Sequence, residues 1–344
     1  MPCADLPEVR RCARQPSKDY RRSRLPRAKR QIETSNGTVL WKDRSCDNCY
    51  PRRMRLHLVD GTYELYRAHF SPRPGHLDPS GADAKATVGI VESMLALLHE
   101  VDEAVTHIAV AFDNPIRSFR NDLYAPYKSD EGVPPELHAQ FDAAEEAIRA
   151  IGATVWSMRE YEADDGLASG ARRFRDEVEQ VRIMTPDKDL GQCIRGDQVV
   201  QVDRRQKKLT NESAFRVNRG FGPESMADYL ALTGDSADGF PGLPGFGTKT
   251  AGMLIGAYQH LEQIPADSSD WKVKPRGAAQ LAATLIDRRD EAILYRKLAT
   301  LIETVPLKES LDDLKFLGVP RERFERWCYQ LGVERLKTAP RRWR

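Results

Sequence analysis

From residue 54 onward, short apolar segments alternate with longer amphipathic ones, and this alternation constrains the fold more than any other feature. Five short segments rich in Val and Ile predict strands: Arg55 to Val59, His107 to Phe112, Thr154 to Trp156, Val181 to Met184 and Val199 to Val202. Helices are predicted at Pro135 to Ile151, at Ala163 to Phe174 and along the apolar stripe Val88, Val91, Met94, Leu95 and Leu98. The pattern predicts an α/β fold with a mostly parallel sheet and helices on both faces.

The chain of 344 residues divides into three parts. Residues 1–53 lack an apolar period and carry a net charge of +8, which leaves the remaining residues at −6. We interpret residues 1–53 as a disordered basic extension or as the product of a translation start assigned too far upstream; a nucleic-acid-binding arm or an organellar presequence are further interpretations. Residues 54–219 are predicted to form the α/β domain. Residues 220–339 are predicted to form a smaller helical domain.

Composition excludes several classes of protein. No uninterrupted apolar run, Ile108 to Phe112 included, exceeds five residues, far fewer than the roughly 18 to 20 that cross a bilayer. Six cysteines in a chain of this length do not form a disulfide framework, so a reducing cytoplasm is expected. Cys46 and Cys49 form a C-x-x-C pair without a second pair of zinc ligands, and Cys193 and Cys328 are expected to pack as small apolar residues.

Acidic residues follow three of the predicted strands. Asp60 and Asp113 end the first and second strands, and Asp187 and Asp189 follow the fourth. A single Asp after a strand commonly caps a helix, but the carboxyl ends of parallel strands share one edge of the sheet. The helix that follows Trp156 begins with acids that either join this edge or only compensate the helix dipole. Seven acidic residues would then crowd together: Asp60, Asp113, Glu162, Asp164, Asp165, Asp187 and Asp189.

Carboxylates this close repel one another unless a cation lies among them. His and Cys are missing from these positions, and an all-oxygen ligand set suits Mg²⁺ or Mn²⁺ rather than Zn²⁺. Asp235 and Asp238 precede a Gly- and Pro-rich loop and complete a second ion site. Two divalent ions are the usual arrangement for in-line displacement at phosphorus, where they activate water and hold the leaving oxygen.

A glycine loop and a basic segment are candidates for contact with a nucleic acid. The first, residues 242–251, places glycines at a turn before an amphipathic helix, predicted from Thr250 to Tyr258. It resembles a helix-hairpin-helix that grips the backbone; a plain turn is the alternative. Its candidate DNA-binding residues are Gly242, Gly245, Gly247, Thr248 and Lys249. The second, residues 114–128, leaves from Asp113 and carries Arg117, Arg120, Tyr127 and Lys128, although it is also compatible with a solvated loop.

Taken in order, these motifs resemble the 5′-nucleases, a family that includes bacterial flap endonucleases and the 5′-to-3′ exonuclease domain of bacterial DNA polymerase I. The resemblance covers about residues 54 to 305. It rests on L-V-D-G at Asp60, F-D at Asp113, F-R and Y-K at Arg120 and Lys128, Y-E-A-D-D at 161–165, T-P-D-K-D at 185–189 and T-G-D-S-A-D-G-F-P-G-L-P-G-F-G at 233–247.

The resemblance implies a PIN-like 5′-nuclease core and a role for each site residue. Asp113, Glu162 and Asp164, with Asp60 through water, would hold one ion, and Asp165 would support them from behind. The other ion would bind Asp187, Asp189, Asp235 and Asp238. Arg120 and Lys128 would lie on a helical arch near residues 115–135 that surrounds a 5′ single strand, with Lys128 at the scissile phosphate. The hairpin loop would grip duplex DNA and bind a monovalent cation such as K⁺.

The sequence also departs from the family pattern. Gly239 stands where asparagine is usual, the arch is only moderately basic, and a polymerase domain does not follow, which implies a free-standing nuclease. A monomer is expected. The predicted function is hydrolysis of DNA phosphodiester bonds at 5′ flaps, nicks, 5′ ends or RNA primer ends in replication and repair. Two alternatives are a PIN-like endonuclease of single-stranded RNA and a non-catalytic protein that binds branched DNA.

Overall fold

The computed structural model describes residues 31–33, 39–41 and 54–344. Strands β1 (Gln31–Glu33) and β2 (Val39–Trp41) pair antiparallel within a unit that ends at Pro51, and they depart from the predicted disorder. The rest of the predicted basic extension, including Cys46 and Cys49, lies outside the described residues. The site and its supporting fold belong to the second unit, Arg52–Arg344.

A six-stranded sheet forms the centre of this unit, in the order β5-β4-β3-β6-β7-β8. All neighbouring strands are parallel except β8, which pairs antiparallel with β7 at one edge. The strands are β3 (Arg55–Asp60), β4 (His107–Asp113), β5 (Thr154–Met158), β6 (Gln180–Met184), β7 (Val199–Asp203) and β8 (Lys208–Thr210). The structure thus confirms the predicted mostly parallel sheet.

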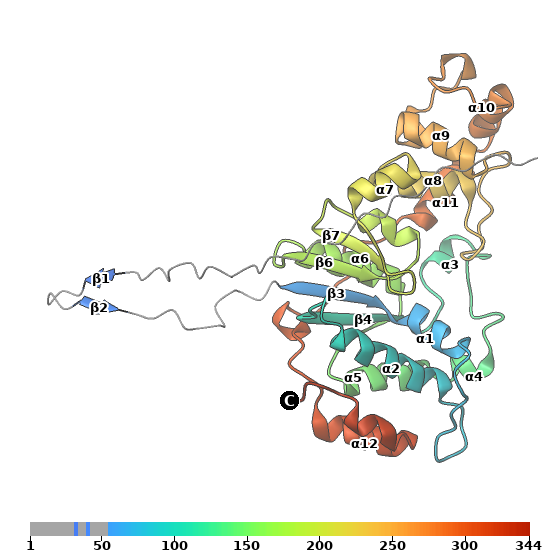
Figure 1. Cartoon of the computed structure of the whole chain (residues 1–344). Coiled ribbons are helices and arrows are strands. Elements are labelled where there is room, and N and C mark those ends of the chain that lie inside the picture. The colour runs from blue at the N-terminus through green and yellow to red at the C-terminus, as the bar shows by residue number, and fades with distance from the viewer. Residues whose placement is uncertain (1–30, 34–38, 42–53) are drawn as a thin grey trace, which may run out of the picture. The chain divides into compact units, whose positions relative to one another are not determined.

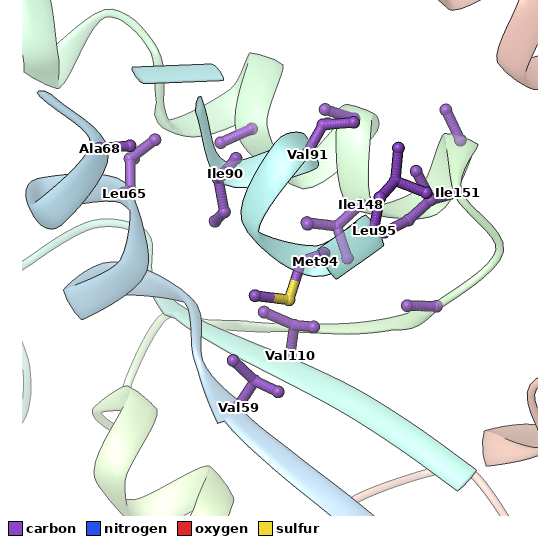
Figure 2. Close-up of a cluster of buried hydrophobic side chains, with 14 of the residues drawn as sticks. Val59, Leu65, Ala68, Ile90, Val91, Met94, Leu95, Val110, Ile148 and Ile151 are labelled. Carbon is purple, nitrogen blue, oxygen red and sulfur yellow. The ribbon is translucent and has the colours of Figure 1, made fainter. Parts of the chain in front are cut away.

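One face of the sheet packs against helices α1 (Gly61–His69), α2 (Lys85–His99) and α5 (Phe141–Ala150) (Figure 1). Side chains alternate between the faces of a strand, so Val59 and Val110 point to this side. There they meet Met94 of α2 and Ile148 of α5, as Figure 2 shows. This buried cluster fixes the position of α1 relative to the sheet. The first turn of α1 begins at the end of β3.

The opposite face of the sheet packs against helix α6 (Ala163–Phe174). Leu58 and Ala111 point to this side, and α6 approaches closely because several of its residues facing the sheet are small. A Cβ on Gly170 would lie 2.6 Å from the Trp156 ring, so only glycine fits there. The N-terminus of α6 is therefore held close to the carboxyl ends of β3 and β4.

A mainly helical part follows β8 and has its own apolar core, which includes Leu230, Phe240, Leu254 and Tyr295. Its helices are α7 (Glu212–Arg219), α8 (Met226–Thr233), α9 (Thr248–Tyr258), α10 (Ala278–Asp287) and α11 (Arg289–Ala299). Short 3-10 turns connect the elements: η1 (Asp189–Cys193), η2 (Pro223–Ser225), η3 (Leu261–Gln263), η4 (Ser268–Asp270), η5 (Asp312–Leu314) and η6 (Glu334–Thr338).

The last helix, α12 (Arg321–Leu331), departs from the predicted division of the chain. Phe324 and Trp327 are buried in the same cluster as α2 and α5, and the Trp343 ring lies 6.1 Å from that of Phe324. The predicted helical domain, residues 220–339, therefore does not stay apart, because its final part completes the core of the α/β half. The apolar spacing in α12 predicts a buried face but not which core buries it.

The predicted elements differ from the observed ones mainly at their ends. The helix predicted over Pro135 to Ile151 is two helices, α4 (Pro135–His138) and α5, because the backbone turns between them. Strand β8 was not predicted, since it is a short edge strand whose Lys208 and Leu209 are exposed. Among residues 54–344 and the two short strands before them, we find no helix that combines the length and the apolar character needed to cross a membrane.

Candidate active site

Two carboxylates leave the sheet at the ends of adjacent parallel strands. Asp60 ends β3 and caps α1, where its Oδ1 accepts a hydrogen bond from the Tyr63 amide at 2.8 Å. Asp113 ends β4, and its own amide donates to the Thr62 hydroxyl at 2.8 Å. Because β3 and β4 pair with Asp60 opposite Ala111, these two side chains come to the same edge.

The segment after β6 adds two more acids to this edge. The Thr185 hydroxyl donates to Oδ2 of Asp60 at 3.0 Å and anchors the segment beside β3. Oδ1 of Asp187 accepts from the Asp189 amide at 2.9 Å, which is a short-range turn of the kind that Asp favours. Asp187 is exposed, whereas Asp189 is buried at the start of η1.

The N-terminus of α6 supplies three acids with different partners. Glu162 and Asp165 form a reciprocal capping box, in which each side chain accepts from the other end of the first turn. Oδ1 of Asp113 accepts from the Ala163 amide at 2.7 Å, so α6 is tied to β4. Asp164 points to the same edge of the sheet and lines the cavity there.

The loop between α8 and α9 brings the last two acids. Carboxylate oxygens of Asp189, Asp235 and Asp238 all lie within 4.8 Å of one another. Oδ1 of Asp235 accepts from the Ala237 amide at 2.9 Å, which fixes the side chain toward Asp189. Residues almost 50 positions apart in the chain thus form one compact acidic group.

Most of these carboxylates open into one cavity of about 370 Å³. Its lining comes from β3, α1, the segment after β4, α6, the segment after β6 and the loop after α8. The lining residues are Asp60, Thr62, Tyr63, Tyr66, Asp113, Ile116, Lys128, Ser129, Asp164, Asp187, Ala237 and Asp238. The predicted convergence of widely separated acids is therefore present in the structure.

Two lysine ammonium groups lie among the carboxylates. Nζ of Lys128 is 3.0 Å from Oε2 of Glu162 and 3.8 Å from Oδ2 of Asp113. Nζ of Lys188 contacts Oδ2 of Asp235 and lies 3.6 Å from Oδ1 of Asp189. Their charges offset part of the repulsion between the acids. Lys188 was not singled out from the sequence, although it lies inside the T-P-D-K-D motif.

Burial and mutual repulsion raise the pKa of several carboxylates in the cavity. Burial, followed by the charge of Asp113 and Asp187, raises the pKa of Asp60 to about 7. Burial also raises the pKa of Asp238 to about 6 and that of Asp164 well above its ordinary value. Burial acts in the same direction on Glu162, but Lys128 and Arg120 outweigh it, so the pKa of Glu162 is lowered.

The donor set fits a hard divalent cation. Every acidic ligand candidate offers only carboxylate oxygen, and the neighbouring Thr62 and Thr185 add hydroxyls. Oδ1 of Asp189 is buried and has no hydrogen-bond partner among the described residues, in a side chain that forms the compact acidic group with Asp235 and Asp238. A buried carboxylate oxygen without a donor is costly, and a bound cation would remove this cost.

Three predicted site residues have other roles in the structure. Arg120 is 1% exposed and donates to both oxygens of Asp165, at 2.7 and 2.8 Å, and to the carbonyls of Leu298 and Thr300. The expected contact of Arg120 with a DNA strand is wrong for this structure, because its buried side chain joins Asp165 to the carbonyls of Leu298 and Thr300. Asp165 is fully buried and uses both oxygens for this pair, so it is not free to bind an ion.

Tyr127, predicted to contact DNA, is 3% exposed and packs in the core of the helical part. Its hydroxyl donates to Oε2 of Glu162 at 3.3 Å. The segment predicted as a helical arch contains only the single turn α3 (Arg120–Leu123) before α4. Arg117 remains exposed and pairs with Asp122 at 3.0 Å. Sequence pattern located this segment next to the acids but did not reveal which side chains turn inward.

The candidate DNA-binding residues of the hairpin loop lie between α8 and α9. Gly242 is buried, and a Cβ there would lie 2.2 Å from the Gly234 amide nitrogen, so it serves the fold of the loop. Gly245, Gly247, Thr248 and Lys249 are exposed around the start of α9. They do not line the acidic cavity. Helix α9 begins two residues before the helix start predicted at Thr250.

An α/β sheet whose carboxyl edge carries clustered acids and two lysines defines a class of metal-dependent enzymes that act on phosphate esters. Two adjoining family models identify the particular family: the 5′-3′ exonuclease N-terminal resolvase-like domain over residues 55–220, and the 5′-3′ exonuclease C-terminal SAM fold over residues 221–322. The chain belongs to the 5′-3′ exonuclease family. These models also confirm the predicted fold class.

Curated relatives and solved structures agree with this family. DNA polymerase I of Bacillus caldotenax is 33% identical over 288 residues, which are 82% of this chain and 32% of that protein. DNA polymerase I of Pseudomonas aeruginosa is 34% identical over 269 residues, 77% of this chain and 29% of that protein. The chain thus spans about a third of the length of these relatives.

Two solved structures share the fold. T5 5′-exonuclease with bound zinc ions has a TM-score of 0.55 at 16% identity, covering 72% of this chain and 90% of that chain. The catalytic core of Rad2 in complex with a DNA substrate has a TM-score of 0.54 at 15% identity, covering 83% and 91%.

Proposed function

We propose that this protein is a 5′ nuclease that hydrolyses DNA phosphodiester bonds at 5′ flaps, nicks and 5′ ends, including RNA primer ends, in replication and repair. One observation carries the proposal: acids from both halves of the chain meet beside two lysines at the carboxyl edge of the sheet. A protein that only bound DNA would gain nothing from so many carboxylates facing phosphate.

The residues fit two divalent ions, Mg²⁺ with Mn²⁺ as a substitute. One group is Asp60, Asp113, Glu162 and Asp164, and the other is Asp187, Asp189, Asp235 and Asp238. Bound there, the ions would supply charge neutralisation and activation of water for in-line displacement at phosphorus.

The chain's own residues orient this chemistry. Thr185 and the Tyr63 amide hold both oxygens of Asp60, and the Ala163 amide holds Asp113. Lys128 extends its ammonium group into the cavity, where it would neutralise charge on a bound phosphate. Its pKa is raised, since Asp113 and Glu162 outweigh the effect of burial, so it remains charged at neutral pH.

The hairpin loop would hold the duplex without reading its sequence. Gly245, Gly247, Thr248 and Lys249 expose backbone amides and one positive charge at the start of α9, which suits phosphate oxygens. A monovalent cation such as K⁺ would assist this contact. The proposal also includes action as a monomer in the cytoplasm.

The test is cleavage of three labelled substrates, a 5′-flap, a nicked duplex and a single-stranded RNA, each with Mg²⁺ and with chelator. Metal-dependent cutting of the DNA substrates is expected, with 5′-phosphate and 3′-hydroxyl products. Preference for RNA would favour a single-stranded RNA endonuclease, and binding of the flap without cleavage would favour a non-catalytic branched-DNA-binding protein. Either result would overturn the proposed function.

A further inference from the structure

Gly239 lies where the segment after β4 meets the loop after α8. Its φ is +79°, and a Cβ at this position would lie 2.4 Å from the carbonyl oxygen of Pro126 and 3.7 Å from the Lys128 amide nitrogen. The first distance is shorter than any real Cβ contact with backbone. Two backbones can therefore touch here only because residue 239 has no side chain.

Hydrogen bonds hold the segment in this docked position. The Lys128 amide donates to the carbonyl of Asp238 at 3.0 Å, directly beside Gly239. The side-chain amide of Asn121 donates to the carbonyls of Tyr127 and Lys128, at 3.2 and 2.9 Å. The Tyr127 ring is buried in the core of the helical part. The backbone on both sides of Lys128 is thus fixed against the loop that carries Asp238.

The docked position determines where the Lys128 ammonium lies. A lysine side chain is flexible, so its reach into the cavity depends on where its backbone is held. With Lys128 bonded to Asp238, Nζ lies 3.0 Å from Glu162 and 3.8 Å from Asp113. A shift of the segment by about 1 Å, enough to relieve a 2.4 Å contact, would move Nζ relative to both carboxylates.

We propose that Gly239 is a positioning residue: its missing side chain lets residues 126–128 dock on the 238–239 backbone and so places the Lys128 ammonium among the catalytic carboxylates. The role of Lys128 in turnover rests on the proposed nuclease function, but the docking itself does not. Gly239 touches no reacting group and would act only through Lys128.

A matched control separates the effect of the Cβ contact at residue 239 from the effect of placing an alanine in a left-handed backbone conformation. Gly220 also has a φ of +79°, but a Cβ there meets nothing within 4 Å. Gly239→Ala and Gly220→Ala therefore introduce the same left-handed alanine, and only the first forces the two backbones apart. Thermal unfolding of both variants establishes that they are folded at the assay temperature.

The first measurement is a double-mutant cycle with Lys128→Ala. Gly239→Ala is expected to lower kcat on a 5′-flap substrate by roughly 10- to 100-fold, because displacement of a reacting group by about 1 Å has effects of this size. In the Lys128→Ala background the same change is expected to have little further effect, and Gly220→Ala is expected to match the parent protein. Equal losses from Gly239→Ala in both backgrounds, or none in either, would overturn the proposal.

The second measurement does not depend on nuclease activity. Limited trypsin digestion of the chelated protein, followed by mass spectrometry, reports cleavage after Lys128. Cleavage there is expected to be at least ~5-fold faster in Gly239→Ala than in Gly220→Ala, because undocking exposes the segment. Equal rates would refute the docking role even if every DNA substrate were cut. If no substrate were cut, faster cleavage would still support docking while the proposed function failed.

Discussion

Asp187 is an exposed carboxylate whose position is fixed by its own turn, and its side chain accepts no other hydrogen bond among the described residues. Asp187→Ala should therefore leave the fold intact and reduce metal-dependent cleavage at least ~100-fold, the scale expected when an electrostatic group at a reacting centre is lost. Steady-state cleavage of a flap substrate measures this. Asp102→Ala removes an exposed acid outside the cavity and serves as the control. An Asp187→Ala variant with the parent rate would remove this residue from the site.

Arg120 gives a contrasting prediction, because its guanidinium is buried against Asp165 and Glu162. Arg120→Met should lower the free energy of unfolding by roughly 3–5 kcal/mol, since it removes the guanidinium that pairs with the fully buried Asp165 carboxylate. Urea unfolding in chelator measures this loss. Arg117→Met, at a side chain that is 70% exposed, should change stability by less than about 1 kcal/mol. Equal stability of the two variants would contradict the internal role of Arg120.

Asp187 and Arg120 differ in how well their positions could be predicted from the sequence. Acids at strand ends were predictable because parallel strands share an edge, so Asp60, Asp113 and Asp187 had to meet. Arg120 and Tyr127 lie in an irregular segment, where no period indicates which side chains turn inward. Their burial depends on carbonyls near Leu298 and on the helical core, contacts almost 180 positions away that no local pattern encodes.

Among the elements, strands with a strong apolar pattern were predicted to within a few residues, and charged or short ones were not. Helix α6 was predicted with its observed ends, because its capping acids mark the start of the helix. Strand β8 pairs only with β7 and buries little, so its sequence carries no apolar alternation. The packing of α12 on α5 could not be predicted from the sequence. An amphipathic pattern predicts that one face of a helix is buried, but not which element packs against it.

The packing of α12 leads to a prediction about stability. The ring of Trp327 is buried and stacks on Phe324, with ring centroids 5.7 Å apart. Trp327→Ala should lower the free energy of unfolding by roughly 3–5 kcal/mol through the lost burial and the cavity left behind. Tyr329→Ala, on the same helix but 74% exposed, should cost less than about 0.5 kcal/mol. Urea unfolding followed by circular dichroism compares the two, and similar losses would contradict the observed packing of α12.

At the scale of the whole molecule, the acidic cavity couples stability to pH. The folded-state pKa values of Asp60 and Asp238, about 7 and about 6, lie above the ordinary value of 3.8. Groups raised in this way favour the folded state below about pH 4, and this stability is lost as pH rises through 6 and 7. In chelator, the free energy of unfolding should therefore fall by a few kcal/mol between pH 5 and pH 8, since one pKa unit corresponds to about 1.4 kcal/mol.

Divalent metal should reverse this trend. Mg²⁺ binds the ionised carboxylates and not the protonated ones, so the stabilisation that it adds should grow from pH 5 to pH 8. Thermal unfolding at each pH, with Mg²⁺ and with chelator, measures the difference. A metal effect that stays constant over this range would mean that the clustered acids do not bind the ion.

The return of residues 316–343 to the α/β half has a consequence for biosynthesis. Phe316, Phe324 and Trp343 cover apolar surface that forms hundreds of residues earlier in the chain. Until the ribosome has added these residues, the apolar surface that they cover stays exposed to water. A chain that stopped before Phe316 would keep this apolar surface exposed and would be prone to aggregation.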